Sequence, residues 1–148
     1  MVRKKLITEL EAHKDEYLEV FGGEHHYNYI LNGLHPPADI NAFAPPEKWL
    51  TFSDMGHIVA TAFNMVVVEL TRVSDFKSET FFPIRGEPTS NPDDSMIVLG
   101  LIPNHFVHIF LKKGCPIPPT CNEWRLFERT EACQRWEDSF LDRQVAFT

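Results

Sequence analysis

The chain has 148 residues, of which 43% are hydrophobic and 24% charged, and its formal net charge at pH 7 is −7. This composition is typical of one globular domain with a single core, so we assign residues 1–148 to one domain. The negative charge argues against nucleic acid as a partner, because a nonspecific nucleic-acid surface needs clustered Lys and Arg. No apolar run approaches the roughly 18 residues of a membrane span, and the amino terminus lacks the apolar segment of a signal peptide. We therefore expect no membrane association and an intracellular location, in the cytoplasm or the nucleus.

Two helices are predicted in the first part of the chain. Apolar residues at helical spacing predict a helix over residues 2–21, which ends at the Gly22-Gly23 pair. A shorter helix follows over residues 24–31 and ends at Gly33. Each has one apolar side, so each is expected to bury one face.

A long loop and a buried helix come next. Two Pro-Pro pairs, which fix φ and remove backbone donors, predict a loop over residues 34–46. A loop of this length in a compact domain is often functional. The helix predicted over residues 54–63 has an apolar face that indicates burial, and Thr51 or Ser53 can cap it.

The second half of the chain contains the predicted sheet. β-branched residues predict a central strand over residues 65–71, with a partner over residues 79–84 across a polar turn. Residues 96–102 and 105–111 are predicted to form an antiparallel pair, and a final helix is expected from about residue 130 to residue 145. This order of elements predicts an α+β fold in which a small, mostly antiparallel sheet packs with helices.

His105 is the best single candidate for chemistry. It begins the second strand of the predicted hairpin, directly after Pro103 and Asn104, so that one flank of its ring is open. A histidine beside a loop is a common position for a catalytic base, and Asn104 is placed to orient the ring. An isolated histidine at a strand end is more often structural, so the functional interpretation of His105 needs a partner group.

The three cysteines are not expected to supply that partner. Cys115 and Cys121 lie in a proline-rich extended segment with no helix to activate a thiol, and Cys133 lies in an acidic helical segment. Their number and position do not suggest disulfides, and their spacing does not match a structural zinc site. We therefore expect reduced thiols, no metal and no cofactor. The histidines at positions 13, 25, 26, 35 and 57 do not form a ligand pattern, and we expect most of them on the surface or on helix faces.

Four segments of the sequence carry a resemblance to a known family. They are EKWLTFSDMGH at 47–57, TFFPI at 80–84, NHFV at 104–107 and KGCPIPP at 113–119. In combination they resemble the OTU-like cysteine protease domains of plant, transposon-derived genes, and the resemblance covers most of the chain. It implies a fold of the papain-like cysteine protease class and a deubiquitinase type of activity, with ubiquitin or a ubiquitin-like protein as partner.

The resemblance also implies the site. In the family, a cysteine that opens a helix after a short loop containing Asp and Gly is activated by a histidine near the carboxyl end of the domain, and His105 matches that histidine. No cysteine precedes His105 here, since the segment that carries the nucleophile belongs upstream of the helix that starts at Val2. We therefore expect an amino-terminally truncated OTU-like domain without its nucleophilic cysteine, in which His105 has no proton to take. The explanations are a truncated gene model, a degenerate copy or a fragment that needs a partner chain, and we favour the first two.

Two functional hypotheses follow. The first is an OTU-like fragment that is related to ubiquitin isopeptidases and inactive alone. The second is a noncatalytic module that holds a ubiquitin-like or other protein with the loop at 34–46 and the sheet edge. Exposed aromatic rings at Tyr27, Tyr29 and Phe43 would favour the second hypothesis. A metal-dependent hydrolase has little support.

Overall fold

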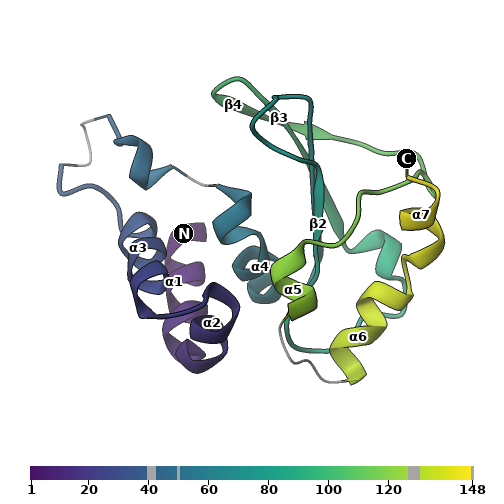
Figure 1. Cartoon of the computed structure of the whole chain (residues 1–148), viewed down its shortest axis with the longest axis horizontal. Helices are drawn as coiled ribbons and strands as arrows, with labels where there is room; N and C mark the ends of the chain where they lie inside the picture. Colours follow the sequence, from purple (N-terminus) through teal and green to yellow (C-terminus); the bar gives the residue numbers. More distant parts are fainter. Residues whose placement is uncertain (40–42, 50, 127–130, 148) are drawn as a thin grey trace.

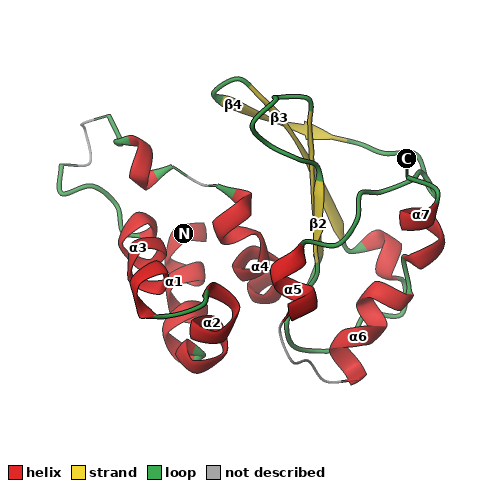
Figure 2. Ribbon diagram, viewed as in Figure 1, coloured by secondary structure: helices red, strands yellow, loops and turns green. Residues whose placement is uncertain are grey.

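The structure, a computed structural model, describes residues 1–39, 43–49, 51–126 and 131–147. Within these residues it has seven α-helices, two short 3-10 helices and one four-stranded sheet (Figures 1 and 2). The prediction of the α+β class is therefore confirmed. The α-helices are α1 (Val2–Ala12), α2 (Lys14–Phe21), α3 (Glu24–Leu34), α4 (Phe52–Phe63), α5 (Asn122–Leu126), α6 (Glu131–Asp138) and α7 (Leu141–Val145). The strands are β1 (Val66–Thr71), β2 (Glu79–Phe81), β3 (Met96–Ile102) and β4 (His105–Ile109), and the 3-10 helices are η1 (Pro46–Lys48) and η2 (Pro92–Asp94).

The sheet has the strand order β2-β1-β3-β4. β1 is central, as its β-branched residues predict, and the two outer pairings are antiparallel. The central pairing differs from the expectation of a hairpin-built sheet, because β1 and β3 run parallel, with Val66 opposite Met96. The chain between β2 and β3 provides the crossover that such a parallel pair requires. The two outer strands end earlier than predicted, β2 at Phe81 and β4 at Ile109.

Helices lie on both sides of the sheet. In Figure 1, α1–α4 lie to the left of the strands, and α6 and α7 lie to the right. On one face of the sheet, Val67 and Phe81 pack against Phe52 and Ala60 of α4. This face is therefore covered where α4 crosses it.

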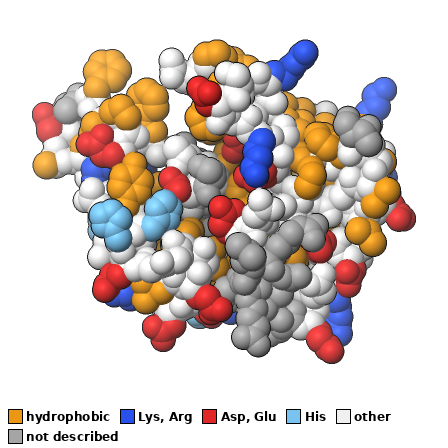
Figure 3. Space-filling model, in the orientation of Figure 1, with side chains coloured by type: hydrophobic (Ala, Val, Ile, Leu, Met, Phe, Trp, Pro, Cys, Tyr) orange, Lys and Arg blue, Asp and Glu red, His pale blue; other side chains and the backbone are white. Residues whose placement is uncertain are grey.

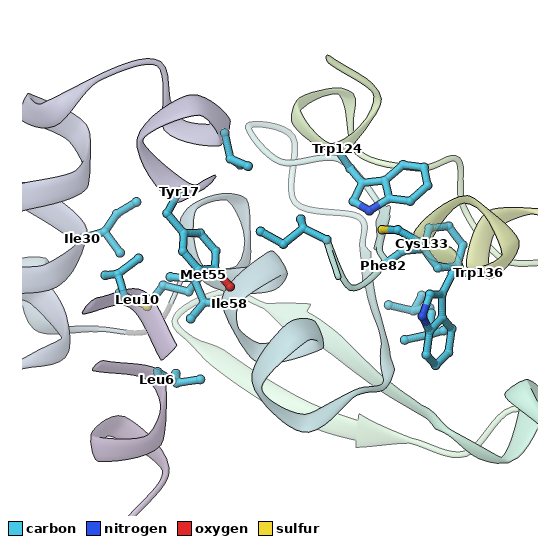
Figure 4. Packing of buried hydrophobic residues seen from close by; sticks show 14 of the residues in the cluster. Leu6, Leu10, Tyr17, Ile30, Met55, Ile58, Phe82, Trp124, Cys133 and Trp136 are labelled. Carbon is cyan, nitrogen blue, oxygen red and sulfur yellow. The ribbon is translucent and has the colours of Figure 1, made fainter. Parts of the chain in front are cut away.

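The opposite face of β1 belongs to the larger core. Val66 and Val68 are fully buried in a cluster that joins the first three helices to the carboxyl-terminal helices. Burial of such apolar side chains contributes roughly 1.5–3 kcal/mol each, before the entropy of ordering the chain is subtracted. Figure 4 shows two groups of side chains in this cluster, Leu6, Leu10, Tyr17, Ile30, Met55 and Ile58 on the helical side and Phe82, Trp124, Cys133 and Trp136 on the carboxyl-terminal side.

The helix predicted over residues 2–21 is in fact two helices. The break falls at His13, whose φ of −126° and ψ of 39° are not helical, and α2 ends at Gly22 with a left-handed φ of 75°. The next helix continues past Gly33 instead of ending there. A Cβ on Gly33 would lie 2.7 Å from the carbonyl oxygen of Glu47, so this glycine permits a close approach of two segments.

The segment before the sheet agrees with its prediction in part. Residues 40–42 of the predicted loop at 34–46 lie outside the described residues, and η1 follows the loop. The next helix, α4, has Thr51 at its N-cap position, but the Thr51 hydroxyl oxygen accepts no hydrogen bond from a backbone N–H of the helix and instead donates to the Asp54 carboxylate at 3.1 Å. No described helix is long and apolar enough to cross a membrane.

Two differences occur near the carboxyl terminus. A helix that the sequence did not predict, α5, begins directly after Cys121, where the preceding prolines indicated extended chain. The predicted final helix is divided into α6 and α7 at Ser139 and Phe140, and Thr130, where we expected it to begin, lies outside the described residues.

Close packing between α4 and β2 is testable at Gly56. A Cβ on Gly56 would lie 2.5 Å from ring carbons of Phe81. We predict that Gly56→Ala lowers the free energy of unfolding by about 1–2 kcal/mol, because overpacking outweighs the gain in helix propensity. Urea denaturation measures the change, with Asn28→Ala on the exposed side of α3 as a control that does not lower stability. A Gly56→Ala variant as stable as the parent chain would contradict this packing.

Candidate functional site

An open groove of about 840 Å³ lies between the helical side of the molecule and the β3–β4 hairpin, and we call it the hairpin groove. It begins beyond the amino-terminal end of α4, where the face of the sheet that α4 covers becomes accessible. Its volume is within the range of about 300–1,000 Å³ that is typical of ligand sites. Its walls include Arg3, Trp49 and Phe52 on the helical side and Glu69, Leu101 and Phe106 on the sheet side.

The helical wall of the groove belongs to an apolar part of the surface. In the space-filling view, apolar side chains gather at the upper left, over the segment that joins α3 to α4 (Figure 3). Phe43 of this segment is fully exposed, and Trp49 of the same segment and Tyr29 of α3 are each about half exposed. Tyr27 is buried, so only two of the three aromatic rings considered for a binding surface are available to a partner.

His105 lies at the rim of the hairpin groove. It is the first residue of β4, opposite Ile102 of β3, and its side chain is exposed. Asn104 has a φ of 59° and forms the left-handed corner of the hairpin turn. Within the described part of the chain, Asn104 donates no hydrogen bond to the His105 ring, so the contacts of this structure give it a role in the turn.

Glu69 is the buried ionisable group of the groove, and the sequence analysis missed it. Its side chain is 5% exposed, and its carboxyl makes no hydrogen bond or ion pair with any described residue. Burial raises the pKa of Glu69 to about 7, and the like charge of Glu79 on the neighbouring strand adds to this effect. The available signal was one acidic residue in an otherwise apolar strand. A carboxyl with a perturbed pKa in a cleft is a candidate functional group.

A second cluster lies outside the groove, where α4 meets the start of α5. The Nε2 atom of His57 is 3.0 Å from the Cys121 sulfur, and the Cys121 thiol donates to Glu123 at 3.0 Å. Cys121 is held there because its backbone amide donates to the Thr80 carbonyl, which ties residues 119–121 to the edge of β2. His57 does lie on a helix, α4, but it faces the interior and not the surface, since it is 1% exposed.

The Cys121–His57 pair has the composition of a nucleophile and its base, but its electrostatics are wrong for that role. Burial raises the pKa of the Cys121 thiol, and its hydrogen bond to Glu123 raises it further. Burial also lowers the pKa of His57 to about 4, against an opposing effect of the Phe82 backbone. Both groups are therefore neutral at pH 7, and neither residue lines the hairpin groove. A thiolate nucleophile needs the opposite shifts.

The other two cysteines are also separate from His105. The Cys133 thiol donates to the Pro83 carbonyl at 2.8 Å in the core, and Cys115 is partly exposed near Arg143, which donates to its carbonyl. None of the three thiols lines the hairpin groove as the described residues define it. Among the described residues, no group of three or more His, Cys, Asp or Glu side chains is arranged to hold a metal ion.

Comparison with known proteins returned no match to a protein-family model, to a curated protein or to a solved structure. The family resemblance therefore depends on the four sequence segments, and the site depends on the geometry described above.

The three thiols are predicted to differ in reactivity. In the native chain, iodoacetamide should modify Cys115 first and Cys121 and Cys133 more slowly by roughly 100-fold or more, because the reaction needs an accessible thiolate. Mass spectrometry of peptides after timed quenching measures the three rates, and the urea-unfolded chain, in which all three should react alike, is the control. Rapid native modification of Cys121 would make the Cys121–His57 pair the better candidate for a catalytic site.

Proposed function

We propose that the chain is an OTU-like domain that keeps the histidine base of a ubiquitin-directed thiol isopeptidase, lacks the nucleophile, and is inactive alone. The observation that supports this proposal is the position of His105, which is exposed at the rim of an open groove while all three cysteines lie elsewhere. The α+β fold, with helices on both sides of a small sheet, is compatible with it.

The chemistry explains why the chain alone is expected to be inactive. Thiol-dependent cleavage of an amide needs a sulfur within hydrogen-bond reach of the base, so that the imidazole takes the thiol proton before the sulfur attacks. The groove at whose rim His105 lies contains no sulfur among the described residues. The thiol that does have an imidazole partner, Cys121, is buried and neutral.

A noncatalytic protein-binding module is the second candidate, and the exposed apolar side chains favour it. Trp49 and Phe76 line the groove and are each about half exposed, and Phe110 beyond β4 is 85% exposed. Aromatic side chains of this kind are enriched in the centres of protein interfaces. This candidate predicts binding of a ubiquitin-like protein without any dependence on a nucleophile.

The proposal predicts that activity appears when a family-type nucleophile segment is joined upstream of Val2. The joined protein should cleave ubiquitin chains, and His105→Ala should lower the rate by roughly 10²–10⁴-fold, the usual contribution of a general base. His108→Ala, an exposed histidine of the same strand, should leave the rate nearly unchanged. Cleavage is followed by gel, together with labelling by a ubiquitin probe that carries a thiol-reactive carboxyl terminus.

The chain without the added segment is the control and should neither cleave chains nor react with the probe. A joined protein that folds and binds ubiquitin but shows no His105-dependent cleavage would contradict the isopeptidase proposal. In that event His105 is structural, and the binding-module candidate accounts better for the groove.

A further inference from the structure

The Glu69 carboxyl makes no hydrogen bond or ion pair with any described residue, and the charged residues around the groove pair with other groups. Glu69 lies directly opposite Glu79 on the same face of the sheet, and like charges in this arrangement repel. Lys77, two residues before β2, pairs with Glu79 at 3.4 Å and not with Glu69. No described residue supplies a cation to Glu69.

Arg3, the cation that lines the groove, is also engaged elsewhere. Its guanidinium donates to the Gly33 carbonyl at 2.8 Å and also to the carbonyl of Lys48. These bonds fix α1 to the end of α3 and to η1. Arg3 therefore holds the helical wall in place, and no hydrogen bond or ion pair joins it to the Glu69 carboxyl in the described structure.

A buried carboxyl without a hydrogen bond is costly, and the cost falls when a cation pairs with it. The walls around Glu69 suit a cation on an apolar stem, because they are rich in aromatic rings. Phe52 and Phe106 lie edge to face, with their ring centroids 5.1 Å apart. Trp49 and Phe76 also line the groove. Aromatic faces attract guanidinium groups, and apolar walls cover the methylene stem of the side chain. The groove has a volume of about 840 Å³, and β4 beside it is an edge strand of the described sheet, to which an extended segment can pair.

We propose that the hairpin groove binds an arginine side chain that is presented by an extended segment of a partner polypeptide, with the Glu69 carboxylate as its acceptor. The planar guanidinium matches a carboxylate with two parallel hydrogen bonds, which an ammonium cannot do. The net charge of −7 favours approach of a cationic segment. The inference goes beyond the proposed function, because it requires neither His105 nor a nucleophile.

The test compares two peptides with one another on the intact chain. Acetyl-Ser-Val-Arg-Val-Ser-amide and the same peptide with citrulline in place of arginine have nearly the same shape, but citrulline has no charge. We expect the arginine peptide to bind about 10-fold more tightly or better, as for a hydrogen bond to a charged group. Titration of the ¹⁵N-labelled chain, followed by NMR, measures both affinities, and the shifts should cluster at Leu101, Phe106 and the Trp49 indole.

Two variants complete the test. Glu69→Gln should remove the preference for arginine over citrulline, while Glu11→Gln, which changes the net charge equally on an exposed part of α1, should keep it. Equal affinity for the two peptides, a preference that survives in Glu69→Gln, shifts away from the groove or no binding at millimolar peptide would each overturn the proposal. Ethylguanidinium that binds as tightly as the arginine peptide would overturn the assignment of a polypeptide partner. The test involves neither ubiquitin nor proton transfer by His105, so failure here does not bear on the isopeptidase proposal.

Discussion

The burial of β1 on both faces is the constraint on which the rest of the molecule depends. Its side chains alternate between two clusters, with Val66 and Val68 in the larger core and Val67 against α4. A central strand of this kind must be covered on both sides, which accounts for helices to the left and to the right of the sheet in Figure 1. The covering by α4 stops near Phe52, so the far end of β1 reaches the groove.

The end of α4 separates two sets of ionisable groups on one face of the sheet, the His57–Cys121 pair and Glu69, and these have opposite properties. Under α4, His57 and Cys121 are sealed, pair with one another, and stay neutral at pH 7. Beyond the end of α4, Glu69 lines an open groove and has no partner among the described residues. The buried pair is closed to a ligand, although the Nδ1 atom of His57 has no hydrogen-bond partner among the described residues. A carboxyl without a partner that lines a groove is available to a ligand. Judged by residue type alone, His57 and Cys121 would be chosen as the functional site before Glu69, because cysteine and histidine are the more familiar catalytic pair.

The sequence predicted what depends on local pattern. The limits of β3 and the central place of β1 follow from runs of β-branched and apolar residues, and the exposed place of His105 follows from the turn before it. The parallel pairing of β1 with β3 was missed, because the order of strands in a sheet depends on how the crossover packs and not on the pattern of either strand. The break at His13 was missed for a similar reason, since the hydrophobic spacing continues through it.

The site was less predictable than the fold because its properties arise from distant residues. Glu69 becomes unusual only when Glu79 is placed opposite it and α4 ends short of it, and His57 becomes buried only when Cys121 reaches it across 64 residues of sequence. A periodicity analysis has no access to such contacts. The four family segments were visible in the sequence, but what they imply for His105 depends on a nucleophile that the described groove does not contain.

The central claim is that the hairpin groove holds a largely buried carboxyl with no partner among the described residues, and the most direct test is the titration of Glu69 itself. Carbon-detected NMR of the side-chain carboxyl, assigned by comparison with Glu69→Gln, follows its chemical shift from pH 3 to pH 9. The account predicts a pKa of about 7 for Glu69. A pKa near the ordinary 4.5 would mean that the carboxyl is hydrated or paired, and would contradict the account.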